Sequence, residues 1–166
     1  MAKSPAASNQ SLRMSYRIGR GEMGVLTFEP YKSHLLPLWR FKTADIARKS
    51  SQDLYDRFLA YDATDDFVGM DMSRKFIQMG VTRAKRYANY KGGRKYSQKG
   101  EEKVAKKKSE GHEGKAEKEE ASRIFRAVWE RCRAHEGYQD KKERFMEEQK
   151  EWDKQNKIKK VKSDPD

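Results

Sequence analysis

Residues 66–96 read DFVGMDMSRKFIQMGVTRAKRYANYKGGRKY, and this stretch predicts one long amphipathic helix that ends at a double glycine. The helix begins near Phe67, or after Asp71 if Gly69 interrupts it. It ends at Gly92, because glycine readily adopts the left-handed conformation that follows a helix. At 100° per residue, apolar side chains gather on one side of this helix, and cations and amides gather on the other.

The polar side of this helix predicts an interface with nucleic acid. Lysine and arginine neutralise phosphates, and arginine, asparagine and glutamine can pair with base edges. The glycines that follow the helix allow a close approach of a phosphate to the backbone. The predicted contact residues are Arg74, Lys75, Gln78, Lys85, Arg86, Asn89, Lys91, Arg94 and Lys95. The alternative is a solvated helix whose polar face is basic without binding a ligand.

The charge balance favours a polyanionic partner. The chain has 166 residues, 39% of them charged, and a formal net charge of +12. Residues 1–96 hold 18 basic and 9 acidic residues (+9), whereas residues 97–166 hold 20 and 17 (+3). Such an excess attracts anions and steers them toward the protein, although it does not determine the fold.

The pattern along the chain predicts an α+β fold. Short apolar runs at 16–18, 25–29 and 35–41 indicate strands of a small antiparallel sheet. This sheet would pack on the helix described above and on an earlier one that starts after Thr43 and runs to about Tyr61. The predicted organisation is a disordered start at 1–12, a basic α+β domain at 13–96, a charged low-complexity linker at 97–118, a helical segment at 119–160 and a tail at 161–166.

An enzyme acting on a phosphate-bearing substrate, such as a nuclease, is the second hypothesis. Residues 19–24 match G-x-G-x-x-G, but no helical pattern follows, so a tight hairpin is favoured over a dinucleotide site. Glu22 and Asp71 are weak catalytic candidates, and with Glu29 and Asp66 they could hold a divalent metal ion. Outside that hypothesis no cofactor or metal is predicted, because no histidine or cysteine pair has metal-ligand spacing. A third hypothesis is an adaptor that binds an acidic protein.

Several features bear on location. The single cysteine, Cys132, fits a reducing compartment, and neither a secretory signal nor a membrane span is recognisable. An intracellular protein, cytoplasmic or nuclear, without a membrane partner is therefore expected. The lysine-rich patches at 103–108 and 157–162 could serve nuclear import or contact nucleic acid. The oligomeric state stays open.

Four segments carry a resemblance to a known family: RIGRGEMGVL, EPYKS, WRFKT and the long stretch at 66–96. Together they resemble the family known as domain of unknown function 4385, found in bacteria, phages and some fungi. The resemblance covers about 16–96 and, more weakly, 121–138. The family has no established activity, so it implies no catalytic residues. It implies that the basic part of the chain is the shared unit.

Overall fold

The computed structural model describes residues 5–19, 24–94, 96–99, 102–105, 108–109 and 111–163. Their regular elements are the helices α1 (Pro5–Ser8), α2 (Gln10–Ser15), α3 (Tyr31–Leu35), η1 (Leu36–Leu38), α4 (Ala44–Ala63), α5 (Phe67–Asn89), η2 (Lys91–Gly93), α6 (Lys115–Ala134) and α7 (Glu136–Ser163), and the strands β1 (Tyr96–Lys99) and β2 (Glu102–Ala105).

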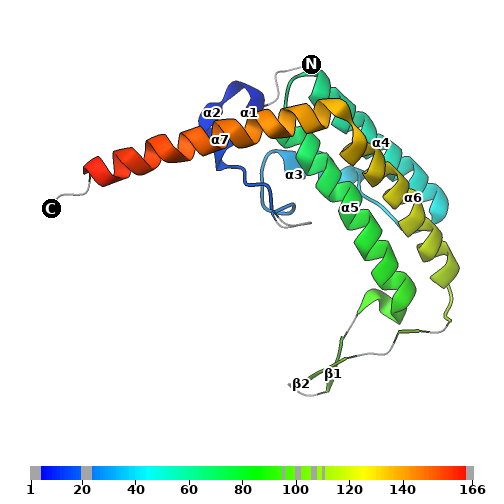
Figure 1. Ribbon diagram of the computed structural model, residues 1–166. Coiled ribbons are helices and arrows are strands. Elements are labelled where there is room, and N and C mark those ends of the chain that lie inside the picture. The colour runs from blue at the N-terminus through cyan, green and yellow to red at the C-terminus, as the bar shows by residue number, and fades with distance from the viewer. Residues whose placement is uncertain are drawn as a thin grey trace.

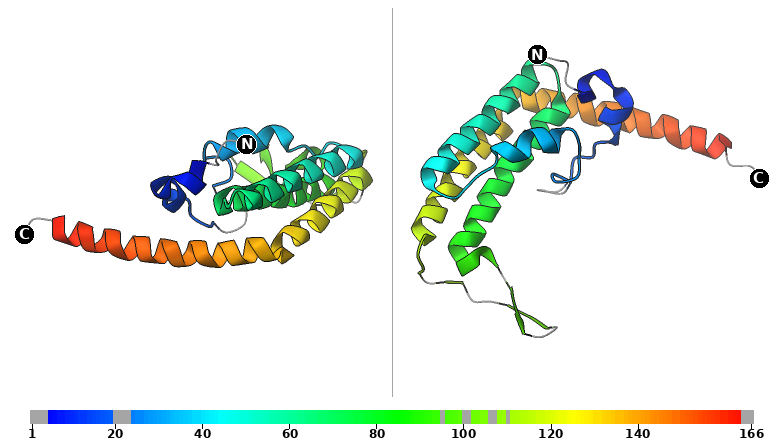
Figure 2. Two further views of the ribbon diagram at one scale, coloured as in Figure 1. Left: turned by 90° about the horizontal axis from the view of Figure 1, so that it is seen from above. Right: turned by 180° about the vertical axis from the view of Figure 1, so that it is seen from behind.

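Three long helices, α4, α5 and α6, pack side by side and form the body of the molecule (Figure 1). After a short turn at His135, α7 leaves α6, crosses the N-terminal end of α5 and extends beyond the body (Figures 1 and 2). The short helices α1, α2 and α3 lie near this crossing. The α5 helix is therefore surrounded by the other elements at its N-terminal half and is more open at its C-terminal half.

Side-chain caps fix where α4 and α5 begin. The hydroxyl of Thr43 accepts a hydrogen bond from the amide of Ile46 (3.1 Å), and the carboxylate of Asp66 accepts one from the amide of Gly69 (3.0 Å). Both side chains satisfy helix N-terminal amides that have no partner within the helix. The expected first helix and the earlier of the two expected starts of the second are thus observed.

The α5 helix approaches its neighbours closely at two glycines. A Cβ atom on Gly69 would lie 2.3 Å from the ring of Tyr61 on α4, and one on Gly80 would lie 2.4 Å from the ring of Phe125 on α6. Glycine inside a helix costs about 1 kcal/mol relative to alanine. The packing of these two rings therefore explains why α5 carries glycine within its length.

One apolar core extends over α4–α7. From α6 it takes Phe125, Val128 and Cys132, and from α7 it takes Tyr138 and Phe145. The helical segment predicted at 119–160 thus packs on the same core as α4 and α5. This core also includes side chains from residues 5–19, which we call the N-terminal arm, among them Met14 and Tyr16.

The predicted α+β fold is wrong: the fold is helical. No strand lies at 16–18, 25–29 or 35–41; residues 31–38 are helical, and the described residues around 16–29 form turns and irregular backbone. Their apolar side chains act as single anchors, since Tyr16, Val25, Tyr31 and Leu35 are buried without any pairing of extended backbone. Pro30 and Pro37 lack the amide that a central strand needs, and both stand at helix starts.

The sheet of the described residues is a two-stranded hairpin elsewhere, between β1 and β2. It pairs Tyr96 with Ala105 and Lys99 with Glu102 in antiparallel register, and it extends beyond the C-terminal end of α5 (Figure 1). The stretch predicted as a charged linker, 97–118, contains most of this hairpin and the first turn of α6.

The start of the chain differs from its prediction as well. Residues 1–12 have the composition of a disordered segment, yet α1 and α2 cover most of the part that is described. Ala6 is buried, and its amide donates a hydrogen bond to the Tyr31 hydroxyl (3.0 Å). Arg13 forms a bidentate ion pair with Glu148 of α7, with both N–O distances at 2.7 Å. These tertiary contacts order a segment whose own composition is too polar to do so.

Candidate functional site

A buried carboxylate, Asp71, connects three distant parts of the chain. It accepts hydrogen bonds from the hydroxyl of Tyr16, from the hydroxyl of Tyr138 (2.7 Å) and from Nε of Arg74 (2.8 Å). Burial by itself would raise the pKa of Asp71, but the Arg74 guanidinium and the two hydroxyls outweigh burial and hold this pKa below its ordinary value. The side chain is therefore an anion that is fully partnered within the fold.

The first three predicted contact residues lie at this buried end of α5. Arg74 pairs with Asp71 and is 8% exposed, and Gln78 is half-buried and accepts a hydrogen bond from Nη1 of Arg74 (2.8 Å). Lys75 is fully buried, with its ammonium 4.8 Å from the centre of the Tyr16 ring, and burial lowers its pKa. Lys75 is therefore not part of the surface.

The next three predicted residues lie at the open end of α5. Lys85 is exposed, whereas Arg86 and Asn89 are half-buried. Lys85 and Asn89 line a hollow of about 380 Å³ together with residues of α6, namely Glu119, Ser122, Arg123 and Arg126. The Ser122 hydroxyl donates to the carbonyl of Val81 (2.9 Å) and ties the two helices together at the floor. Sequence reasoning missed the two α6 arginines.

Lys91 and Arg94 are exposed just beyond the end of α5, and Lys95 lies outside the described residues. The α5 helix ends at Asn89, three residues before the predicted end, and Gly92 and Gly93, with positive φ values of 77° and 72°, lie in the short turn η2 that follows. Of the weak catalytic candidates, Asp71 is partnered as described above, and Glu22 lies outside the described residues, as does most of the glycine-rich motif at 19–24. Within the described part of the chain, no three histidine, cysteine or acidic side chains gather where they could hold a metal ion.

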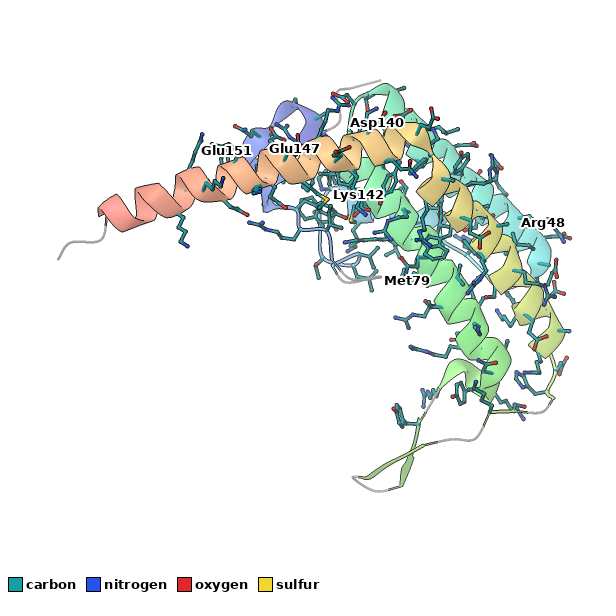
Figure 3. The ribbon with its side chains drawn as sticks, in the orientation of Figure 1. Arg48, Met79, Asp140, Lys142, Glu147 and Glu151 are labelled. Atoms are coloured by element: carbon teal, nitrogen blue, oxygen red, sulfur yellow. The ribbon has the colours of Figure 1, made fainter. Side chains whose placement is uncertain are left out.

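A second hollow, of about 480 Å³, lies at the buried end of α5. It is lined by Arg74 and Gln78 of α5, by Trp129 and Arg133 of α6, by Tyr138, Gln139 and Lys142 of α7, and by Ile18 and Gly19 of the N-terminal arm. Figure 3 shows Lys142 below α7, beside α5. Among the residues that the structure describes, no acidic one lines this hollow.

The two hollows lie in line on one face of the packed pair of α5 and α6, and we take them as the two ends of one groove. On α5 their lining residues follow at helical spacing, 74, 78, 85 and 89. On the antiparallel α6 they follow in the opposite order, 133, 129, 126 and 122. At 1.5 Å per residue, the groove is about 22 Å long. We call it the α5–α6 groove.

Four cations of the α5–α6 groove have no acidic partner in the part of the chain that the structure describes: Lys85, Arg126, Arg133 and Lys142. Within the described residues none of them has a carboxylate oxygen within 4.0 Å, whereas Arg123 pairs with Glu120 (2.7 Å). Arg133 instead lies over the ring of Trp129, with its guanidinium carbon 4.6 Å from the ring centre. Two amides, Gln78 and Asn89, accompany these cations. The groove thus offers uncompensated positive charge along its length.

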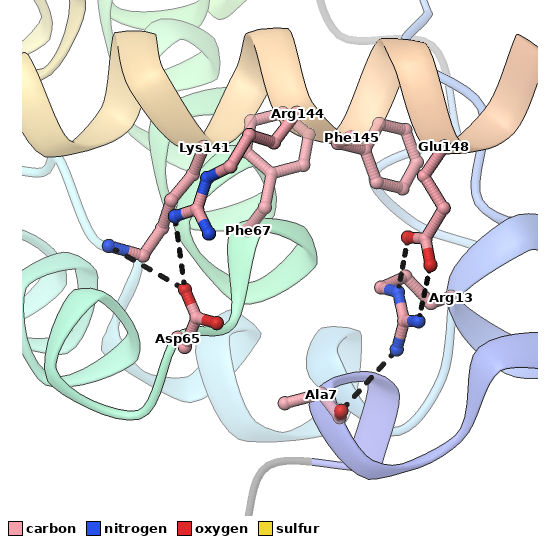
Figure 4. A pocket seen from close by; sticks show the side chains of 8 residues that line it. All are labelled: Ala7, Arg13, Asp65, Phe67, Lys141, Arg144, Phe145 and Glu148. Carbon is pink, nitrogen blue, oxygen red and sulfur yellow. Dashed lines mark hydrogen bonds and ion pairs between the residues drawn. The ribbon is translucent and has the colours of Figure 1, made fainter.

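A third hollow, of about 350 Å³, contains charges that are already neutralised. It lies between the N-terminal arm and α7, where Arg13 pairs with Glu148 and both Lys141 and Arg144 pair with Asp65 (Figure 4). Each cation lining it thus has a carboxylate within 4.0 Å. These ion pairs hold the arm and the α4–α5 turn against α7 and leave no unpaired charge for a ligand.

The comparisons with known proteins place the chain in one family. A family model described as domain of unknown function DUF4385 matches residues 4–148, so the chain belongs to that family. This confirms the resemblance seen in the sequence and extends it over the N-terminal arm, α6 and the first half of α7. No curated protein and no solved structure matches the chain. Among the helices that the structure describes, none is sufficiently long and apolar to span a bilayer.

Proposed function

We propose that this protein binds nucleic acid along the α5–α6 groove. The observation that carries the proposal is a row of four cations that have no ion pair among the described residues: Lys85 of α5, Arg126 and Arg133 of α6, and Lys142 of α7. Some surface cations elsewhere in the described chain, such as Arg17 and Arg48, pair with acids, whereas others, such as Arg57 and Lys154, stand singly and are not aligned with further cations along two packed helices. Cations aligned without counter-charges favour a ligand whose negative charges are regularly spaced, and a phosphate backbone is such a ligand.

The geometry favours a single strand over a duplex. Packed helices lie about 8–10 Å apart, and Gly80 brings α5 and α6 particularly close. The furrow between two helices that pack this closely is narrow, so it suits one backbone lying lengthwise, with the amides of Gln78 and Asn89 beside it, whereas a duplex would touch only the rims of the furrow. Lys91 and Arg94 would extend the same basic path toward the β1–β2 hairpin.

We expect binding of the full chain to a fluorescent single-stranded oligonucleotide to fall steeply with salt. Four phosphate contacts predict a slope of about −3 for the logarithm of the association constant against the logarithm of salt concentration, because each contact releases counterions. Fluorescence anisotropy over a salt series, with single-stranded and double-stranded DNA and RNA, measures this slope. Cleavage of the oligonucleotide in the presence of magnesium would favour the nuclease hypothesis.

The double variant K85A/R126A should reduce the slope by about 1.4, half of its wild-type value, and weaken binding on the order of tenfold near 0.1 M salt. The melting temperature should stay nearly unchanged, because both side chains lie on the rim of the groove. The matched control is R57A/K154A, which also removes one arginine and one lysine from exposed positions. Equal binding by both variants would contradict the groove. Binding to an acidic protein that excess nucleic acid does not displace would favour the adaptor hypothesis instead.

A further inference from the structure

We propose that the hollow at the α7 end of the groove binds a terminal phosphate monoester, so that the protein recognises a phosphorylated end of a strand. This inference deepens the proposed function and rests on it. The hollow combines three cations, Arg74, Arg133 and Lys142, with two amides, Gln78 and Gln139. Its described lining contains no acid, so it suits a group of high negative charge.

Arg74 provides a fixed donor in this hollow. Its Nε donates a hydrogen bond to Asp71 (2.8 Å) and its Nη1 donates one to Gln78 (2.8 Å). The residue as a whole is only 8% exposed. A guanidinium held in this way loses little conformational entropy when an anion binds, and its planar fork matches phosphate oxygens. The single negative charge of Asp71 offsets only one of the three cations, so the hollow keeps an excess of positive charge from Arg133 and Lys142.

Arg133 and Lys142 reach the same hollow from different helices. The ring of Trp129 supports the Arg133 guanidinium. Lys142 differs sharply from its neighbour Lys141, whose ammonium lies 2.6 Å from an oxygen of Asp62. In the described chain Lys142 has no such partner. Cations left unpaired beside a fixed arginine are typical of phosphate sites.

The shape of the groove explains why the ligand would be a chain end. The α7 helix crosses the N-terminal end of α5 (Figure 1). Its residues Tyr138, Gln139 and Lys142 form one wall of the hollow. A strand that follows the groove from the hairpin end therefore meets α7 and cannot continue in line. A terminal monoester carries a charge of about −1.5 to −2 at pH 7, whereas an internal diester carries only −1, so the three cations favour the end.

The test compares the full chain's affinity for short single strands that differ only at their ends: 5′-phosphate, 3′-phosphate or hydroxyl at both. We expect one phosphorylated end to bind about tenfold more tightly than the hydroxyl-ended strand. R133A/K142A should bind all three strands alike. K85A/R126A should weaken all three and keep the preference, and R57A/K154A should behave as the wild type. Inorganic phosphate and a nucleoside monophosphate are tested as competitors of strand binding. The same two compounds are added in thermal-shift measurements of the melting temperature.

Failure of this inference is distinguishable from failure of the proposed function. Equal binding of all strands by the wild type would overturn the phosphate site while leaving the groove as a nucleic-acid interface. A different result would be no binding of any strand, together with thermal stabilisation by the nucleoside monophosphate in the wild type but not in R133A/K142A. That result would support a phosphomonoester site whose ligand is a small molecule. A preference retained in R133A/K142A would also overturn the assignment, because the end would then be read elsewhere.

Discussion

Replacement of Asp71 by asparagine is expected to destabilise the protein by about 3–5 kcal/mol, since it leaves Arg74 as a buried charge without its counter-ion. The change conserves size, so the loss reports charge and hydrogen bonding and not a cavity. The hydroxyls of Tyr16 and Tyr138 would each lose an anionic acceptor. The N-terminal arm and α7 should therefore loosen together with α5.

Urea denaturation followed by circular dichroism measures this effect, and the D140N variant is its control. Asp140 lies exposed on α7 and forms no ion pair with the described residues, so the same chemical change there should cost less than about 0.5 kcal/mol. Asp140 is labelled on the outer side of α7 in Figure 3. A loss below about 1 kcal/mol in D71N would contradict the central role of this carboxylate.

The same carboxylate predicts a pH dependence of stability. The pKa of Asp71 lies below its ordinary value in the folded protein, because Arg74 and two hydroxyls outweigh the effect of burial. Its contribution to stability is therefore fully present above an ordinary aspartate pKa of about 4, and it is lost as the pH falls through the lower folded value. Stability measured from pH 7 down to pH 2 should fall more steeply in the wild type than in D71N. Parallel curves would contradict an ionised Asp71.

The second large effect is expected from G80A. A Cβ at this position lies 2.4–2.6 Å from three ring atoms of Phe125, which is itself fully buried and cannot move aside freely. Alanine favours a helix over glycine by about 1 kcal/mol, so propensity alone predicts stabilisation. Overpacking of a core costs about 1–3 kcal/mol and occasionally more. We expect this cost to exceed the gain in helix propensity, so the free energy of unfolding should fall by about 1–2 kcal/mol.

A double-mutant cycle with F125L separates packing from propensity. In the F125L background the ring is gone, so G80A should cost much less and could even stabilise the helix. Thermal or urea unfolding of the wild type, both single variants and the double variant provides the coupling energy. An unchanged cost of G80A in the F125L background would contradict the close contact between α5 and α6.

Local signals in the sequence predicted the long helices well. Thr43 as a cap, acidic Asp45 after it, and the glycines after Asn89 are local features that act in the same way in any fold. The prediction of strands was wrong because short apolar runs, such as those around Tyr16 and Leu35, are compatible with two kinds of structure. They can be strands of a sheet or single anchors on a helical core, and only tertiary packing decides between them.

The candidate site was predicted from α5 and the segment that follows it, and this explains which residues the prediction lacked. A helical wheel places Arg74 and Lys75 with Lys85 on one polar side, but it cannot show that Asp71, the N-terminal arm and α7 cover the first two. Arg126 and Arg133 of α6 recur at helical spacing too, and that periodicity was the available signal. Their meeting with Lys85 depends on the antiparallel packing of two helices separated by a hairpin, which no local pattern encodes.

The three donors that surround Asp71 have a consequence for synthesis of the chain on the ribosome. Tyr16 and Arg74 emerge early, but Tyr138 follows Asp71 by 67 residues, and Phe125 of the shared core follows it by 54. Until α6 and the start of α7 have left the exit tunnel, the faces of α5 that they cover are solvated and its buried carboxylate lacks a donor. The body of this protein therefore completes its packing late in synthesis, as one unit. Before that, the nascent α4–α5 pair exposes apolar surface to which chaperones would bind.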